Sequence, residues 1–320
     1  MQILPDEIYV DLECLESELR SQIACDDAII CEAATQLLEG GGKRLRPTLA
    51  LLTSRLGDYS RERILPLAVG LELLHMATLV HDDIVDGALI RRGQATVRAR
   101  WGEQVSVYVG DYLFGRSLYL FSKYQDPTIM GILSGISLEM CEGEIKQIAS
   151  TFNLGESLRS YFRRIRRKTA LLISASCKAG AVCTKAPALY CRAVGRYGLY
   201  LGMAFQITDD VLDVTAEESQ LGKPVGSDLK EGIITLPAIL ALNNARQSRE
   251  LEKLLLKRNK DQEEISRCIE IIKDSGAIER TLLIARRYLN KAKAYLMLLP
   301  NNQIRQSLIT IADFVATRTY

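Results

Sequence analysis

Apolar residues recur along most of this chain with the spacing of one face of an α-helix. Around Leu67, Leu71 and Leu74 they follow the i, i+4, i+7 pattern, and residues 189–214 and 265–299 show the same period. The sequence has no long apolar–polar alternation and no Asn-Gly or Asp-Gly pair between β-branched runs, which are the usual strand signals. We therefore expect an all-α fold of roughly a dozen helices, since typical helices have about 8–20 residues.

The composition neither divides the chain nor makes it disordered. None of the 320 residues lies in a stretch that resembles a flexible linker, so we predict one all-α domain over residues 1–320. Hydrophobic residues make up 48% and the net charge is only +2, which excludes a disordered chain and leaves no basic excess for a nucleic-acid partner. The triplet Gly40-Gly41-Gly42 predicts a break before a helix that begins near Pro47.

Three features bear on where the protein works. Acidic residues from Asp6 onward and the lack of an apolar run make the N-terminus unlike a secretory signal. The longest apolar stretch, residues 64–80, contains Pro66, Glu72 and His75, so it predicts a buried core helix and no transmembrane segment. Eight cysteines are scattered without a CxxC pair. Together these features indicate a cytoplasmic protein with reduced thiols.

The most informative motif is an acidic pentapeptide, DDxxD, that occurs twice. The copies, Asp82–Asp86 and Asp209–Asp213, begin 209 − 82 = 127 residues apart, and each follows an apolar helical segment. The helix period brings the first and last aspartate of each copy onto one face, where their like charges repel. A single copy could be a solvated helix end, but two copies after apolar segments indicate a common ligand.

A divalent cation would relieve this repulsion. Carboxylate oxygens suit Mg²⁺, which keeps waters and bridges to phosphates, so two facing motifs could hold two or three Mg²⁺ ions and one diphosphate. Zinc is disfavoured because the chain has only two histidines, His75 and His81, and no cysteine close to them in sequence.

Basic residues that could bind a diphosphate directly flank these motifs. The segment Gly41–Pro47 combines a glycine turn, three cations and a helix start, and Arg91-Arg92 follows the first acidic motif by five residues. Each could alternatively be a solvated basic surface. His75 lies seven residues before Asp82 and shares its helix face within about 20°. We favour a diphosphate hydrogen bond for His75 over a buried core role.

Between Leu38 and Leu240 the chain carries, in order, GGKRLRP, ELLHMATLVHDDIVD with RRG, GDYLFG, RKTA, FQITDDVLD and GKPVGSDL–TLP. In these motifs it resembles the all-trans polyprenyl diphosphate synthases. Residues 143–177 are similar more narrowly to the larger, catalytic component (component 2) of bacterial heptaprenyl diphosphate synthases. The resemblance implies the isoprenoid synthase fold, a single helical bundle around a central cavity. Where many relatives have a lysine after Glu-Gly, this chain has Ile233.

The resemblance also implies roles for individual residues. The metal ligands would be Asp82, Asp86 and Asp209, with Asp83, Asp210 and Asp213 in support. Isopentenyl diphosphate would be held by Lys43, Arg46, His75 and Arg92. The allylic diphosphate would be held by Arg91, Lys168, Thr169, Gln206 and Lys223. The residues expected to act in catalysis are Asp82, Asp86, Asp209 and Lys168.

The expected reaction is Mg²⁺-dependent chain elongation. An allylic diphosphate, farnesyl diphosphate for the expected product, ionises, the double bond of isopentenyl diphosphate attacks, and a proton leaves. The resemblance implies heptaprenyl diphosphate for menaquinone side chains as the product, and a small non-catalytic component 1 subunit, or a second copy of the chain, as the partner. The alternatives are other products (geranylgeranyl, hexaprenyl, octaprenyl or solanesyl), a non-catalytic regulatory subunit and a terpene cyclase.

Product length depends on the floor of the cavity. Ala77 and Thr78 lie one turn before Asp82 on its helix face, and both are small. We interpret them as an open floor that permits a long product. The alternative is that they only allow neighbouring helices to pack closely.

Overall fold

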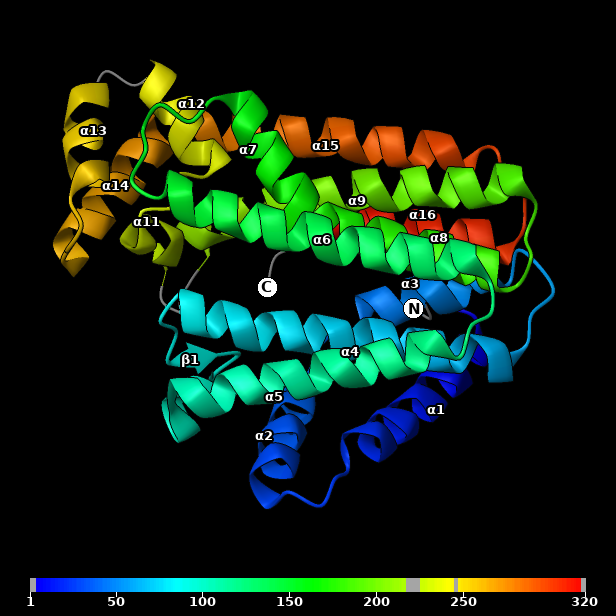
Figure 1. Cartoon of the computed structure of the whole chain (residues 1–320). Coiled ribbons are helices and arrows are strands. Elements are labelled where there is room, and N and C mark those ends of the chain that lie inside the picture. Colours follow the sequence, from blue (N-terminus) through cyan, green and yellow to red (C-terminus); the bar gives the residue numbers. More distant parts are fainter. Residues whose placement is uncertain (1–3, 217–224, 245–246, 318–320) are drawn as a thin grey trace. The chain divides into compact units, whose positions relative to one another are not determined.

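The computed structural model describes residues 4–216, 225–244 and 247–317, and it confirms the all-α prediction. Figure 1 shows the helices, which range from short turns to rods of more than twenty residues. In the first part of the chain they are α1 (Asp6–Ile23), α2 (Ala28–Glu39), α3 (Leu45–Ser54), α4 (Arg61–Val85), α5 (Val97–Ser122), α6 (Pro127–Ser150) and α7 (Leu158–Ile165). In the second part they are α8 (Leu171–Cys183), α9 (Ala188–Thr215), α11 (Ser227–Glu231), α12 (Leu236–Asn244), α13 (Ser248–Leu256), α14 (Gln262–Asp274), α15 (Ala277–Leu296) and α16 (Gln303–Ala316).

Two short elements depart from this pattern. A π-helical turn, η1 (Arg166–Ala170), joins α7 to α8, and a two-stranded antiparallel hairpin, β1 (Ile90–Arg91) and β2 (Gln94–Ala95), follows α4. Neither has a clear signal in the sequence.

The chain divides into two compact units. Unit 1 comprises the described parts of Met1–Gly135, Ile173–Arg196 and Tyr295–Thr310. Unit 2 comprises those of Ile136–Leu172, Tyr197–Ala294 and Ile311–Tyr320. A single domain over residues 1–320 stays a prediction.

Helix α4 is the main core element of unit 1. It packs against α1, α3 and α5, and it buries Leu67, Leu71 and Leu74, the residues that show the helical period in the sequence. Among the described residues α4 alone has the length and hydropathy to cross a membrane, and 67% of its most apolar 18-residue window is buried inside the protein. This burial supports the predicted core helix over residues 64–80.

The ends of the helices follow local chemistry. Helix α4 begins after Ser60, whose side chain accepts a hydrogen bond from the N–H of Arg63, as is typical of an N-cap. The predicted long helical stretch over residues 265–299 is two helices, α14 and α15. Gly276 interrupts it with a φ of 67°, a left-handed conformation that glycine adopts without strain and that ends helices.

Unit 2 has its own apolar core. Side chains from α7, α9, α12 and α14 share it, and Tyr161 and Leu236 are fully buried there. In each unit, therefore, a helix with buried apolar side chains carries an acidic motif near its C-terminal end: α4 in unit 1 and α9 in unit 2.

The close approach of α4 to α5 generates a stability prediction. A Cβ at Gly70 would lie 2.4 Å from Cε1 of the buried Phe121, whereas a Cβ at Gly115, an exposed helical position of α5, would meet no described atom within 4 Å outside its own helix. We expect Gly70→Ala to destabilise the protein by about 1–3 kcal/mol through overpacking. Gly115→Ala should stabilise it by about 0.5–1 kcal/mol through helix propensity. Melting temperatures that move in the same direction for both variants would contradict this packing.

Candidate active site

The first acidic motif lies at the C-terminal end of α4. Asp82 is in the last turn, and Asp86 is the C-cap, whose N–H donates to the Asp82 carbonyl at 2.8 Å. The last carbonyls of a helix carry partial negative charge, so they add to the repulsion between these carboxylates. This end of α4 therefore favours a bound cation.

The middle aspartate of this motif is already engaged. Asp83 is buried, and its Oδ1 accepts a hydrogen bond from Arg91 Nε at 2.7 Å. Its buried Oδ2 meets no hydrogen-bond donor among the described residues. Burial raises the pKa of Asp83, and the Arg91 guanidinium opposes that shift. Asp83 thus holds Arg91 beside the motif, while the predicted ligand roles of both residues stay predictions.

The hairpin after α4 turns through a tight loop that contains Arg92. Its two-residue loop is Arg92-Gly93, with φ values of 52° and 74°. Positive φ at both positions is the signature of the type I′ turn, which matches the twist of the flanking strands. The usual sequence for this turn is Asn-Gly, whereas this chain has Arg92-Gly93. The sequence analysis therefore did not predict the hairpin.

Arg92 reaches back to the glycine segment. Its Nη1 donates to the carbonyl of Gly41, 51 residues earlier in the chain. A Cβ at Gly42 would lie 2.9 Å from Arg92 Nη1 and 3.0 Å from Arg44 Nη1. The glycine therefore leaves room for two guanidiniums beside the backbone that leads into Lys43 and α3, which begins two residues before Pro47.

Arg44 connects this segment to three helices. Its side chain is 11% exposed and pairs with Glu16 of α1 (Nε–Oε1 2.6 Å) and with Glu72 of α4 (Nη1–Oε1 3.1 Å). It also donates to the carbonyl of Leu38 at the end of α2. Sequence reasoning did not give Arg44 a separate role, because neither partner is near it in sequence.

Electrostatics indicate a compact cationic cluster in unit 1. Burial lowers the pKa of Arg46 to about 10, with Glu72 opposing and Arg92 adding to the shift. Burial, then Arg46 and Arg92, lower the pKa of His75 well below its usual value. His75 is therefore neutral at pH 7 and offers a hydrogen bond, while the arginines supply the charge for an anion.

The second acidic motif lies in the last turns of α9. The central Asp210 is buried and uses both carboxyl oxygens: Oδ2 accepts from the Tyr161 hydroxyl at 2.6 Å and Oδ1 from Gln206 Nε2 at 2.9 Å. Burial first, and then Asp228, raise the pKa of Asp210 to about 7. Asp213 accepts from the N–H of Asp228 at 3.2 Å and so contacts the start of α11.

The π-turn presents two of the predicted site residues. Lys168 Nζ lies 3.2 Å from Glu144 Oε2 of α6, and the Thr169 hydroxyl donates to Gln206 Oε1 at 2.6 Å. A π-turn inserts one residue into the helical hydrogen-bond pattern, and such turns are frequent at functional sites. Glu144 and Tyr161 are partners that sequence reasoning missed, since only the fold brings them to the motifs.

Each unit gathers part of the predicted residue set. Unit 1 contains Lys43, Arg46, His75, Asp82, Asp83, Asp86, Arg91 and Arg92. Unit 2 contains Lys168, Thr169, Gln206, Asp209, Asp210 and Asp213. Lys223 lies outside the described residues. The two predicted chain-length residues are in unit 1: Ala77 is 2% exposed, and the Thr78 hydroxyl donates to the carbonyl of His75.

The donors present fit Mg²⁺. Within the described parts of the chain, no three histidine, cysteine or carboxylate side chains form a preassembled metal cage. Mg²⁺ does not need one, because it usually takes one or two protein carboxylates and completes its shell with waters and phosphate oxygens. The outer aspartates of the two motifs offer carboxylates of this kind, and their role as metal ligands stays a prediction.

Comparisons with known proteins agree with this chemistry. Residues 27–272 match the family described as Polyprenyl synthetase, and the chain belongs to this family. It is 42% identical over 310 residues to heptaprenyl diphosphate synthase component 2 of Bacillus subtilis (strain 168), covering 97% of this chain and 88% of the relative. The corresponding protein of Geobacillus stearothermophilus is 44% identical over 310 residues, 97% of this chain and 96% of the relative.

Solved structures give the same result. Heptaprenyl diphosphate synthase from Staphylococcus aureus superposes with a TM-score of 0.92 at 35% identity, over 97% of this chain and 98% of that one. A polyprenyl synthase from Caulobacter crescentus, complexed with calcium and isoprenyl diphosphate, has a TM-score of 0.93 at 36% identity, over 97% and 95%. The chain therefore has the isoprenoid synthase fold, and it is a trans-prenyltransferase of isoprenoid biosynthesis that elongates prenyl chains.

Glu72 generates a prediction for the cationic cluster. Glu72→Gln removes the buried negative charge shared by Arg44 and Arg46, so the free protein should lose about 1.5–3 kcal/mol of stability. Inorganic pyrophosphate would restore the missing negative charge, so it should raise the melting temperature of this variant more than that of the wild type.

The matched control is Glu16→Gln, because Glu16 pairs with the same Arg44 but is 39% exposed, compared with 5% for Glu72. Water compensates for an exposed charge, so this control should lose less than about 1 kcal/mol. Equal melting curves for the two variants, with and without pyrophosphate, would disprove the charge-balancing role of Glu72.

Proposed function

We propose that this chain condenses isopentenyl diphosphate with an allylic diphosphate, farnesyl diphosphate for a long product, to make all-trans heptaprenyl diphosphate. The main observation behind the proposal is that each unit combines an acidic motif at the end of a buried helix with cations on adjoining elements. An acid-lined metal site and a basic anion site are the two requirements of diphosphate chemistry. The component 2 relatives support the heptaprenyl product.

The proposed metal is Mg²⁺, as two or three ions. The ligands would be Asp82, Asp86 and Asp209, with Asp83, Asp210 and Asp213 as further or supporting ligands. Calcium with isoprenyl diphosphate in the Caulobacter crescentus enzyme supports a divalent ion in this chain. When bound, the ions would neutralise the carboxylates and stabilise the charge of the departing diphosphate. We also propose that residues 1–320 act as a single prenyltransferase domain.

The remaining residues have separate roles in this proposal. Lys43, Arg46, neutral His75 and Arg92 orient isopentenyl diphosphate so that its double bond faces the allylic carbon. The residues that hold the allylic diphosphate are Arg91, Lys168, Thr169, Gln206 and Lys223. Lys168 stabilises negative charge on the oxygen that leaves when the allylic C–O bond breaks. The electron pair of the isopentenyl double bond then forms the new C–C bond, and the released diphosphate accepts a proton from the adjacent carbon.

Partner, location and pathway extend the same proposal. The name component 2 of both Bacillus-type relatives supports a small component 1 subunit as a partner, with a homodimer as the alternative. We further propose a cytoplasmic enzyme whose product supplies menaquinone side chains.

Incorporation of labelled isopentenyl diphosphate into products grown from farnesyl diphosphate tests the function. Asp82→Asn and Asp209→Asn should each lower kcat by about 100-fold or more, because each removes charge stabilisation at the leaving group. Asp274→Asn, at an exposed aspartate in the last residue of α14, is the matched control and should retain full activity. Incorporation by the wild type, with or without candidate component 1 proteins, supports catalysis. No incorporation under either condition would support the regulatory-subunit alternative.

Product length tests the role of Ala77. Ala77→Phe would add a ring below the first acidic motif, so the longest product should shorten by at least one isoprene unit. The same substitution at the exposed Ala99 should leave the distribution unchanged. Chromatography of dephosphorylated products measures both, and an unaltered distribution for Ala77→Phe would refute the chain-length role.

A further inference from the structure

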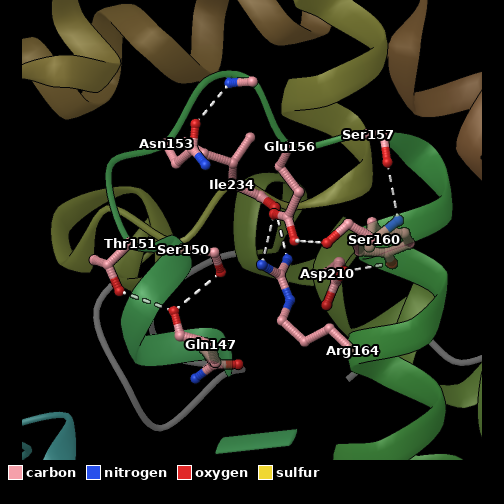
Figure 2. A network of polar contacts seen from close by, with 12 residues as sticks. Gln147, Ser150, Thr151, Asn153, Glu156, Ser157, Ser160, Arg164, Asp210 and Ile234 are labelled. Atoms are coloured by element: carbon pink, nitrogen blue, oxygen red, sulfur yellow. Dashed lines mark hydrogen bonds and ion pairs between the residues drawn. The ribbon is translucent and has the colours of Figure 1, made fainter. Parts of the chain in front are cut away.

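A buried ion pair fixes the region beside the second acidic motif. Arg164 Nη1 lies 2.7 Å from Glu156 Oε2, and the two side chains are only 6% and 2% exposed. Arg164 Nη2 donates to the carbonyl of Ile234 at 2.7 Å, and the Ser160 hydroxyl donates to the other Glu156 oxygen. Figure 2 shows Arg164 reaching Glu156 and Ile234 from α7. One guanidinium therefore ties together the loop before α7, α7 itself and the segment before α12.

Burial of the Arg164–Glu156 pair costs solvation free energy, so its stability contribution does not explain its presence. Removing two charges from water costs several kcal/mol per ion, so a buried pair contributes little stability compared with apolar side chains of the same size. Its geometric effect is large, because it fixes α7 and the loop before it to the segment before α12, 70 residues later in the chain.

Tyr161 connects the ion pair to the acidic motif. The Arg164 guanidinium carbon lies 5.6 Å from the centre of the Tyr161 ring, and the ring is fully buried. The Tyr161 hydroxyl donates to Asp210 Oδ2 at 2.6 Å. Because Gln206 donates to Asp210 Oδ1, both oxygens of this carboxyl face protein donors.

The chain of hydrogen bonds continues to the π-turn. Gln206 donates to Asp210 with its nitrogen, which leaves its Oε1 to accept from the Thr169 hydroxyl at 2.6 Å. Thr169 follows Lys168 on the same turn. The orientation of Asp210 therefore determines the orientation of Gln206, and through it the position of Thr169.

We propose that Tyr161, supported by the Arg164–Glu156 pair, is a positioning residue that locks Asp210 toward the protein and so orients the allylic-diphosphate side of the active site. The hydroxyl is the group that acts, because a phenylalanine would fill the same apolar space but could not donate a hydrogen bond to Asp210. Asp209 projects about 100° away from Asp210 around α9, on the side where we propose the metal. The inference rests on the proposed function, in which Asp209, Gln206 and Thr169 act on the metal-bound allylic diphosphate.

The test compares Tyr161→Phe with Tyr197→Phe, which removes the hydroxyl of another fully buried tyrosine in unit 2. For Tyr161→Phe, we expect the Mg²⁺ concentration at half-maximal rate and the KM for farnesyl diphosphate to rise about tenfold, which corresponds to about 1.4 kcal/mol. The KM for isopentenyl diphosphate should stay within about twofold, because the residues proposed to bind it lie in unit 1. Tyr197→Phe should match the wild type in all three constants.

A second readout does not need turnover. Mg²⁺ added to protein with inorganic pyrophosphate should raise the melting temperature less for Tyr161→Phe than for Tyr197→Phe or the wild type. Arg164→Lys, which keeps the charge but loses the forked contact, should shift the same constants in the same direction by less. If Tyr161→Phe does not fold, the Arg164→Lys variant tests the positioning role instead.

The outcomes separate two failures. A wild type that forms no prenyl product would sink the proposed function, and the melting experiment would still decide whether Tyr161 acts on metal binding. An active wild type with a Tyr161→Phe variant indistinguishable from Tyr197→Phe would overturn the positioning role. An equal rise in the KM for both substrates would also overturn it, since it indicates general loosening of the fold.

Discussion

Repulsion between carboxylates at the ends of two helices is the constraint on which this structure depends. Asp82 and Asp86 share the C-terminal end of α4, and the second motif occupies the last turns of α9. Both positions add carboxylate charge to the negative end of a helix dipole. A fold that keeps such groups must supply cations, and the cationic groups near each motif are arranged accordingly.

A buried ion pair lies beside each candidate binding region. In unit 1, Glu72 pairs with Arg44, and its charge opposes the fall in the pKa of Arg46. In unit 2, Arg164 and Glu156 compensate each other and fix the segments around Tyr161. Neither arrangement is an efficient source of stability, since buried charges lose their hydration. Their effect is to hold groups in place before a ligand arrives.

Much of the fold and most of the candidate residues could be predicted from the sequence. The apolar period of Leu67, Leu71 and Leu74 marks α4, and the first acidic motif lies at the C-terminal end of that helix. The interruption at Gly276 was missed because a helical period continues on both sides of a single residue whose φ is positive. Tyr161 was missed because a tyrosine on an amphipathic helix carries no sign of a partner 49 residues away.

The sequence by itself determined which residue types are available and where helices form, since helix periodicity and the spacing within a motif are local properties. Only the tertiary structure decided that Arg92 meets the carbonyl of Gly41, that Arg164 meets that of Ile234, and that a π-turn carries Lys168. These contacts join residues 51 and 70 positions apart, or depend on one extra residue within a helix. Such contacts depend on how helices pack together, and local sequence patterns do not encode that packing.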